Sequence, residues 1–394
     1  MSVLDYLESS LLRLFSWIEA QEWQGIDHYD IMDSRLFRPL LKTKPGRIFS
    51  ILLLDTAPGF LRSITRTHPK RNPKAVALLA QAYLDYFAVT GDDNYRAMSL
   101  YAADWLVENA SPGYRYPCWG YPFNWQADSF LPAYTPSGVV TAHVIDALLS
   151  AYRVSNDRKY LDTCAKACGF FKEYLRLTVF SRDEVSFSYT PYDQEVCHNA
   201  SLLVAAAIFK TAAADSAVDV SLAGKAVRFV MNQQNDDGSW YYAYPVGRID
   251  PYHTGFVLRS LFEIHKVRPD VEIPQRIERG LRYFERNLFD SSLVPYFRVG
   301  RKYPVDIHSC AEGILCFSEL ASFDGHGLEK SERTARWTID HMQDKEGFFY
   351  YRKYPMHTVK IAYFRWAQAW MARALASLIL RNRKARNTKS MIER

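Results

Sequence analysis

The 394-residue chain is predicted to be all-α, a closed (α/α)6 toroid in which six helical hairpins form an inner and an outer ring. Two stretches support this prediction because they repeat. Residues 226–242 and 335–351 each place an amphipathic helix before a polar turn, with a glycine at the same offset and a Tyr-Tyr ending. An open helical solenoid is the main alternative.

Two kinds of helix alternate along the chain. Six amphipathic segments have apolar residues at i, i+3, i+4 and i+7, as outer helices should: 3–20, 95–108, 159–176, 221–234, 274–287 and 331–341. Six more apolar segments, rich in small residues, suit an inner ring and begin at Asn72, Thr141, His198, His253, His308 and Arg365. The later starts lie roughly 55 to 60 residues apart, which is enough for two helices and a loop.

Composition is that of a water-soluble globular protein, with 48% hydrophobic and 23% charged residues. No linker rich in Pro, Gly or Ser interrupts the middle, so we expect one domain over residues 1–380 and a frayed basic tail over 381–394. The net charge of +6 is weak support for nucleic-acid binding, which we do not expect. Short strand-like patches at 184–190 and 239–245 are predicted to be loop hairpins.

The remaining bulk features predict a cytoplasmic protein. None of the six cysteines forms a C-x-x-C pair, which favours reduced thiols. The first residues carry acids where a signal peptide has bases, and no run of about 18 apolar residues predicts a membrane span.

Polar residues at the starts of the inner helices are predicted to converge. Inner helices of a toroid run parallel, so their N-termini gather at one electropositive end. His198, His253 and His308 open three successive inner helices, and Asp250 and Asp306 precede two of them. Each aspartate, taken alone, is best explained as a helix cap. Three histidines at equivalent positions favour a functional cluster.

Acid–base chemistry on a glycan, especially an anionic one, is the leading hypothesis for this cluster. The catalytic candidates are His253, His308, Asp250, Asp306, Tyr241 and Tyr351. Aromatic, amide and cationic side chains from the preceding loops complete the substrate-binding candidates, which are Trp119, Trp125, Gln126, His198, Asn199, Asp236, Trp240, Tyr242, Arg352 and Arg365. The aromatic loop over residues 114–129 is interpreted either as a lid or as a platform for a sugar. Asp236 and Asp250 could instead form a hydrolytic carboxylate pair.

Two other chemistries are disfavoured. Asp306, His308, Cys310 and His253 are zinc-ligand types, but on a helix Asp306 and Cys310 would share a face while His308 points away. A terpene cyclase would need an acidic D-x-D-D or D-D-x-x-D motif in an apolar setting, which the sequence lacks. We therefore expect neither a metal nor a cofactor.

Several segments together resemble a bacterial family associated with exopolysaccharide and lipopolysaccharide biosynthesis. They are CWGYPFNWQ (118–126), CHNASLL (197–203), QNDDGSWYY (234–242), IDPYHTGFVL (249–258), YPVDIHSCAEGI (303–314) and YFRWAQAWMARAL (363–375), with HYDIMDSRLF (28–37) and NPKAVALL (72–79). The layout is also similar to six-hairpin glycosidases and to the helical domain of glucuronyl C5-epimerases. The stretch QQNDDGSW (233–240) resembles the structural turn of the terpenoid cyclase and prenyltransferase toroid.

The residues and this resemblance together predict a protein that binds and modifies a bacterial surface polysaccharide or its precursor. The preferred reaction is epimerisation or elimination on a uronic-acid-type sugar. A six-hairpin glycoside hydrolase is one alternative, and a non-catalytic glycan-binding or scaffold protein of a biosynthesis complex is another. Partners would then be the glycan and other polysaccharide-biosynthesis proteins.

Overall fold

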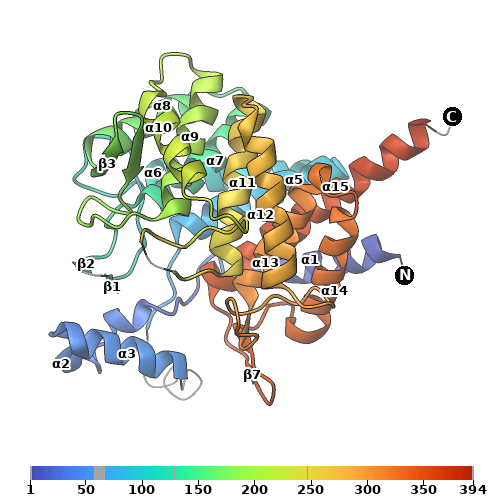
Figure 1. Cartoon of the computed structure of the whole chain (residues 1–394). Coiled ribbons are helices and arrows are strands. Elements are labelled where there is room, and N and C mark those ends of the chain that lie inside the picture. The colour runs from blue at the N-terminus through green and yellow to red at the C-terminus, as the bar shows by residue number, and fades with distance from the viewer. Residues whose placement is uncertain (1, 57–66, 128, 246, 393–394) are drawn as a thin grey trace.

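The computed structural model describes residues 2–56, 67–127, 129–245 and 247–392, and its helices close into the predicted toroid (Figure 1). The outer helices are α1 (Val3–Ala20), α6 (Asp93–Glu108), α8 (Arg158–Glu173), α10 (Ser221–Asn232), α12 (Glu272–Leu288) and α14 (Gly327–Met342). The inner helices are α5 (Pro73–Thr90), α7 (Gly138–Ser155), α9 (His198–Ala214), α11 (Pro251–Val267), α13 (Ile307–Glu319) and α15 (Ala369–Ile392). Each inner helix packs on the next, and α15 packs on α5, so the ring is closed and not an open solenoid.

Burial explains why the two rings differ in sequence. The inner helix α9 is buried on every face over its first twelve residues, so its sequence is apolar and alanine-rich. The outer helix α12 buries one stripe instead, formed by Ile273, Ile277, Leu281, Phe284 and Leu288, and exposes charged residues elsewhere. The alternation predicted from sequence is therefore the alternation of inner and outer rings.

The two repeated turns dock on the neighbouring outer helix. Gly238 has φ of 96°, and a Cβ there would lie 2.6 Å from the carbonyl oxygen of Arg279 on α12. Gly347 has φ of 105°, and its Cβ would lie 2.4 Å from the carbonyl oxygen of Arg13 on α1. Only glycine satisfies both the positive φ and the close approach. The second turn joins α14 to α1 and so closes the outer ring.

Short strands occupy the end of the ring where the inner helices begin, which is called the mouth from here on. They are β1 (Trp125–Gln126) with β2 (Phe130–Leu131), and an antiparallel sheet of β5 (Val305–Asp306), β6 (Arg352–Lys353) and β7 (Thr358–Val359). A hairpin of β3 (Leu177–Ser181) and β4 (Glu184–Phe187) confirms the patch predicted at 184–190. The patch at 239–245 forms no strand and makes only one isolated bridge, between Cys197 and Ala243.

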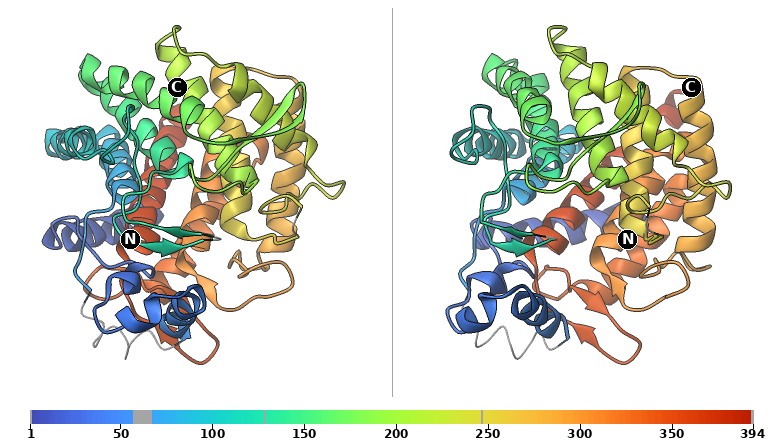
Figure 2. Two further views of the ribbon diagram at one scale, coloured as in Figure 1. Left: turned by 90° about the vertical axis from the view of Figure 1, so that its left-hand side faces the viewer. Right: turned by 60° about the vertical axis from the view of Figure 1, so that its left-hand side comes forward.

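A segment between α1 and α5 projects from the mouth (Figure 2). It contains the short helix η1 (Asp30–Asp33), α2 (Arg38–Leu41) and α3 (Lys44–Thr56), none of which the sequence patterns predicted. A small core of its own holds it together, formed by Ile31, Met32, Phe37 and Leu54. Residues 30–56 are called the arm below.

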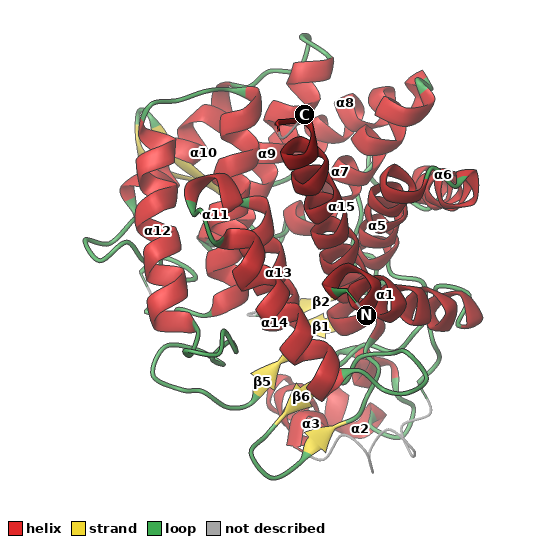
Figure 3. Ribbon diagram, turned by 90° about the vertical axis from the view of Figure 1, so that its right-hand side faces the viewer, coloured by secondary structure: helices red, strands yellow, loops and turns green. Residues whose placement is uncertain are grey.

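The β1–β2 hairpin, the sheet of β5, β6 and β7, and the arm all lie at the mouth, and the C-terminus lies at the opposite end (Figure 3). The basic stretch expected to fray beyond residue 380 continues α15 as helix to Ile392 and is exposed over residues 383–388. Among the described residues, no helix combines the length and the apolar composition that a membrane crossing requires.

Candidate active site

Helix caps position the polar side chains at the mouth. Asn72, Asp250 and Asp306 cap α5, α11 and α13, and in each a side-chain oxygen accepts a backbone N–H at 3.0 Å. The capping role predicted for these residue types is thus confirmed. Both aspartates have a second role, because their carboxylates also bind side chains of the site.

Asp250 orients His253. Its Oδ2 lies 2.7 Å from Nδ1 of His253, and a carboxylate only accepts, so Nδ1 carries the proton and Nε2 is left as the proton acceptor. Burial lowers the pKa of His253 below its ordinary value, although Asp250 opposes the shift. The ring centroids of Tyr242 and Tyr252 lie 4.3 and 4.1 Å from that of His253. This imidazole is therefore neutral, held in one tautomer and flanked by rings.

His308 lies deeper, inside a box of aromatic rings. Its ring centroid is 4.8 Å from that of Tyr252, 4.6 Å from that of Trp366 and 4.9 Å from that of Trp370. Both ring nitrogens are buried, and neither has a hydrogen-bond partner among the described residues. Burial, assisted by the positive charge of Lys74, holds the pKa of His308 well below its ordinary value. A neutral imidazole with two unused nitrogens is available for a ligand.

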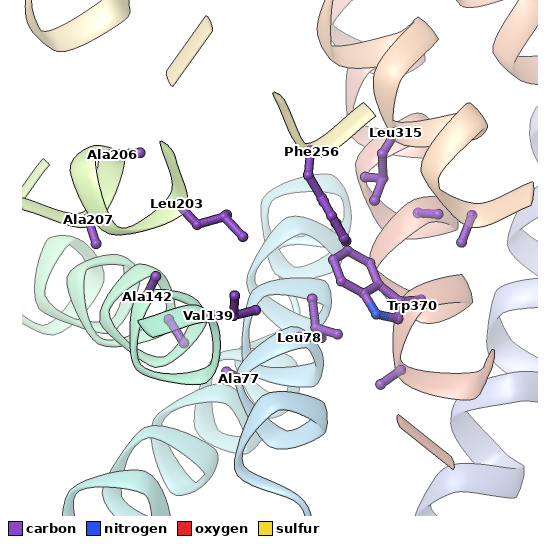
Figure 4. Packing of buried hydrophobic residues seen from close by; sticks show 14 of the residues in the cluster. Ala77, Leu78, Val139, Ala142, Leu203, Ala206, Ala207, Phe256, Leu315 and Trp370 are labelled. Atoms are coloured by element: carbon purple, nitrogen blue, oxygen red, sulfur yellow. The ribbon is translucent and has the colours of Figure 1, made fainter. Parts of the chain in front are cut away.

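Figure 4 shows Phe256 and Trp370 packed against each other inside the ring. Lys74 and His143 lie beside this pair and complete a group of basic side chains. The Nζ of Lys74 lies 5.4 and 5.2 Å from the ring centroids of Phe256 and Trp370. Burial, with Arg365 nearby, lowers the pKa of Lys74 to about 7. The ring of His143 lies 5.4 Å from that of Trp370, and its buried Nε2 has no partner within the described part of the chain. The four residues Lys74, His143, His253 and His308 are called the basic cluster below.

A column of buried ion pairs lies beneath the basic cluster, along the inner helices. The carboxylate of Glu312, one turn after His308 on α13, accepts two hydrogen bonds of 3.0 Å from Arg259. Burial nevertheless raises the pKa of Glu312 to about 7. Arg259 also binds Glu319 at 2.7 Å, Glu319 binds Arg373, and Arg373 binds Asp85. This column forms the floor of the site.

The acidic groups beside the basic cluster are engaged by cations or by indole N–H groups. Arg365 binds Asp27 in a buried, two-pronged ion pair of 2.6 and 2.8 Å. Asp306 accepts from Arg352 Nε at 2.8 Å and from Trp366 Nε1 at 2.8 Å. Arg352 and Arg365, which the sequence suggested for anionic groups of a substrate, thus already neutralise aspartates.

Several predicted binding residues lie away from the basic cluster. Trp119 and Trp240 are core residues, since their indole N–H groups donate to the carbonyls of Leu106 and Val230, each at 2.8 Å. Asp236 is exposed in the turn that packs on α12, so it cannot pair with Asp250 for hydrolysis.

His198 also points away from the other two predicted histidines. Its Nδ1 donates to the carbonyl oxygen of Tyr241 at 2.7 Å, and its ring faces Phe229 of the outer helix α10 at 5.7 Å. Tyr241 contributes this carbonyl, while its side chain is exposed. The structure therefore does not bring His198 or the Tyr241 ring to the basic cluster.

Other predicted residues lie at the mouth. Tyr242 packs on His253, and Tyr351 is buried beneath the guanidinium of Arg352 at 4.3 Å. Trp125 and Gln126 are half-buried in β1, where Gln126 accepts from Arg47 of the arm at 2.5 Å. Asn199 lines the same small pocket as Asp250 and His253, and its Oδ1 accepts a hydrogen bond from the Cys197 thiol at 3.0 Å.

The aromatic box around His308 was missed in the sequence. Tyr252, Phe256, Trp366 and Trp370 were not candidates, and neither was Glu312 beneath them. A signal was present, because the members form i,i+4 pairs and therefore share one helix face: Tyr252 with Phe256, Trp366 with Trp370, and His308 with Glu312.

The zinc ligand set considered from sequence does not assemble. Burial raises the pKa of the Cys310 thiol to about 12, and Asp306 is bound to Arg352 and Trp366. In the described ranges, no group of three or more His, Cys, Asp or Glu residues could hold a metal ion.

Comparison with known proteins identifies the fold. No protein-family model matches the chain, and no curated protein sequence matches it. A cellobiose 2-epimerase from Bacillus thermoamylovorans is similar in structure, with a TM-score of 0.63 and 14% identity over 79% of this chain and 89% of that one. A D-mannose isomerase (0.60, 11%, 79% and 88%) and an α-mannanase from Bacteroides thetaiotaomicron (0.60, 12%, 82% and 89%) are also similar. The chain therefore has the (α/α)6 fold that these carbohydrate-processing enzymes share.

Proposed function

We propose that the protein is a sugar epimerase or isomerase that moves a proton at a carbon next to a carbonyl group. The observation that carries this proposal is the pair of neutral imidazoles, His253 and His308, which both pack on the ring of Tyr252. Each is a proton acceptor at neutral pH, and His308 has no partner in the described structure that would compete with a substrate. Two bases at one carbon are what proton removal and return require.

The reaction follows from the basic cluster. One imidazole removes the proton from the carbon, and the electron pair of the C–H bond moves to form an enediolate whose oxygen carries negative charge. Lys74, half protonated near pH 7, lies where it can neutralise that charge. In an isomerisation, the imidazolium so formed returns the proton to the neighbouring carbon. In an epimerisation, the imidazolium releases its proton to solvent, and the other imidazole takes up a proton from solvent and gives it to the opposite face of the carbon. The rings of Tyr252 and Trp366 supply flat surfaces for the sugar.

Hydrolysis is less well supported by the same geometry. A glycosidase of the usual kind needs two carboxyl groups, one as acid and one as base or nucleophile. Asp27, Asp250, Asp306 and Glu312 all lie near the basic cluster, but each is bound to an arginine or histidine. The acid–base groups left for chemistry are nitrogen bases.

An uncharged sugar fits the site better than a uronate, because Arg352 and Arg365 already bind aspartates. The finer setting that we propose, the biosynthesis of a bacterial surface polysaccharide, depends on the sequence resemblance and not on this geometry. Elimination from a uronate remains the second reaction to test, with Lys74 as the group that would face the carboxylate.

The test is deuterium uptake. The protein is incubated in D2O with reducing mono- and disaccharides and with uronates, and NMR measures deuterium at the carbon next to the carbonyl. We expect uptake that His253→Asn and His308→Asn each reduce at least 100-fold. His265→Asn is the matched control, because His265 lies at the other end of α11 from His253.

Three results would contradict the proposal. They are release of new reducing ends without deuterium, formation of an unsaturated uronate, and uptake that is the same in the two histidine variants as in the wild type. The first indicates a hydrolase and the second a lyase. The third means that the basic cluster does not move the proton.

A further inference from the structure

The arm exposes an unusual set of large apolar side chains. Leu36 is 60% exposed, Phe49 is 54% exposed and Leu52 is 57% exposed, and Leu40 and Ile48 are exposed beside them. On α3, Ile48, Phe49 and Leu52 share one face, while Ser50 and Leu54 on the other face are buried. The arm therefore buries one side in its small core and presents a second apolar side to solvent.

The arm carries a net positive charge, and its cations are concentrated in one stretch. Residues 34–54 contain five cations and no acidic residue, while the three acids of the arm lie at its ends, at Asp30, Asp33 and Asp55; the cations are Arg35, Arg38, Lys42, Lys44 and Arg47. Arg35, Arg38 and Lys42 are exposed among the apolar side chains. Elsewhere in the chain, exposed cations commonly pair with neighbouring acids, as Arg96 does with Asp93. A negatively charged surface would complement the exposed Arg35, Arg38 and Lys42.

Contacts with the mouth fix where this surface lies. Arg47 donates to Gln126 of β1 at 2.5 Å, and its guanidinium lies 5.0 Å from the ring centroid of Phe130 on β2. Phe130 is itself exposed, so it extends the apolar side of the arm. The arm and the β1–β2 hairpin are thus in contact and lie on the same side of the molecule (Figure 1).

We propose that the arm docks on an anionic lipid membrane, with α2 and α3 lying in the plane of the interface. Apolar side chains flanked by cations on short helices match the chemistry of an interfacial segment, in which the rings and Leu side chains enter the acyl boundary and the cations meet lipid phosphates. Docking places the mouth against the membrane surface.

Vesicle binding tests this proposal with the full-length chain. Sedimentation is measured with vesicles of phosphatidylcholine alone and of phosphatidylcholine mixed with phosphatidylglycerol. We expect binding to the mixed vesicles, little binding to phosphatidylcholine, and release as salt rises, because ionic screening weakens the attraction. Phe49→Glu should lower the partition coefficient at least tenfold. Val271→Glu, at a residue 87% exposed at the opposite end of the ring, should leave it unchanged.

A second pair of variants tests the charges. Arg38→Gln with Lys42→Gln should weaken binding to the mixed vesicles about 30-fold, since each cation near the surface contributes about fivefold. Arg96→Gln with Arg158→Gln removes the same charge from the far end and should have no effect. Circular dichroism checks that all variants are folded.

Three results would overturn the proposal. One is a wild-type protein that stays in solution with mixed vesicles at low salt. Another is an equal loss of binding in Phe49→Glu and Val271→Glu, because binding would then not depend on the arm. The third is a wild-type dimer that Phe49→Glu converts to a monomer, since the arm would then cover a second copy of the chain.

Discussion

Replacing Lys74 by methionine should stabilise the protein while removing a group of the basic cluster. The side chain is buried over the rings of Phe256 and Trp370, where an unbranched methionine fills similar space. Burial lowers the pKa of Lys74 from 10.5 in a free side chain to about 7. The folded state thus binds this proton less tightly than the unfolded state, which makes the lysine destabilising wherever the unfolded chain is protonated.

The magnitude follows from the two pKa values. At pH 7 the lowered pKa costs the folded state about 4 kcal/mol, and at pH 10 about 1 kcal/mol, because the unfolded lysine is then losing its proton too. The cation–π contacts of the Lys74 ammonium stabilise the wild type by about 1 kcal/mol at pH 7, and methionine cannot make them. A net gain of about 3 kcal/mol corresponds to a Tm higher by about 4 °C in a chain of this length.

The assay is thermal unfolding of the wild type and Lys74→Met, followed by circular dichroism at pH 7 and pH 10. The gain in Tm should be about 4 °C at pH 7 and about 1 °C at pH 10. Lys345→Met, at an exposed lysine, is the control and should change Tm little at either pH. A gain that does not depend on pH, or a lower Tm for Lys74→Met at pH 7, would refute the burial argument.

Three further predictions concern other parts of the structure. The kcat/KM of the deuterium exchange should fall above about pH 7, because Lys74 then loses its proton. It should also fall at a pH below 6.5, the ordinary pKa of histidine, because the imidazoles then become protonated. A profile that does not fall at high pH would exclude Lys74 from the reaction. Asp27→Asn should lower the urea unfolding free energy by about 3 to 5 kcal/mol because it leaves Arg365 buried without its charge partner. An Asp27→Leu/Arg365→Met double variant should recover most of that loss; a double variant as unstable as Asp27→Asn would mean that the pair itself stabilises the fold. Gly347→Ala should lower Tm more than Gly113→Ala, since both have positive φ but only Gly347 faces a backbone oxygen; equal losses would mean that the turn is not docked on α1.

The ring was predictable because burial on all sides leaves a mark in the sequence. An inner helix such as α9 must be apolar around its circumference, and an outer helix such as α12 must be apolar along one stripe. The helix caps were predictable because capping is local: Asp250 and Asp306 each accept a backbone N–H of the helix that they begin.

The direction of a side chain was harder to predict than the element that holds it. Trp240 and Trp370 both lie near the start of an inner helix or the loop before it, yet one fills the space between the rings and the other faces His308. Each residue along a helix turns by about 100°, so the rotation of the helix in the ring decides which rings form the site. The rotation of each helix about its own axis could not be inferred from a single sequence.

The arm was missed for a different reason. Its helix α2 has four residues and α3 has thirteen, and both are held by a core of only a few side chains. The four residues of α2 are too few for a helical period to be recognised. The exposed apolar residues of the arm also weaken the pattern, because they lie on the face where a surface helix normally carries polar groups.

The column of ion pairs below the basic cluster limits how a ligand can reach it. Glu312 is fully buried and accepts two hydrogen bonds from Arg259, so opening a passage between them would leave charges without partners. A ligand of the basic cluster must therefore approach from the mouth, because the column occupies the axis of the ring below it. Since His308 is only 2% exposed, we expect the proposed reaction to occur at the terminus of a sugar chain and not in its middle.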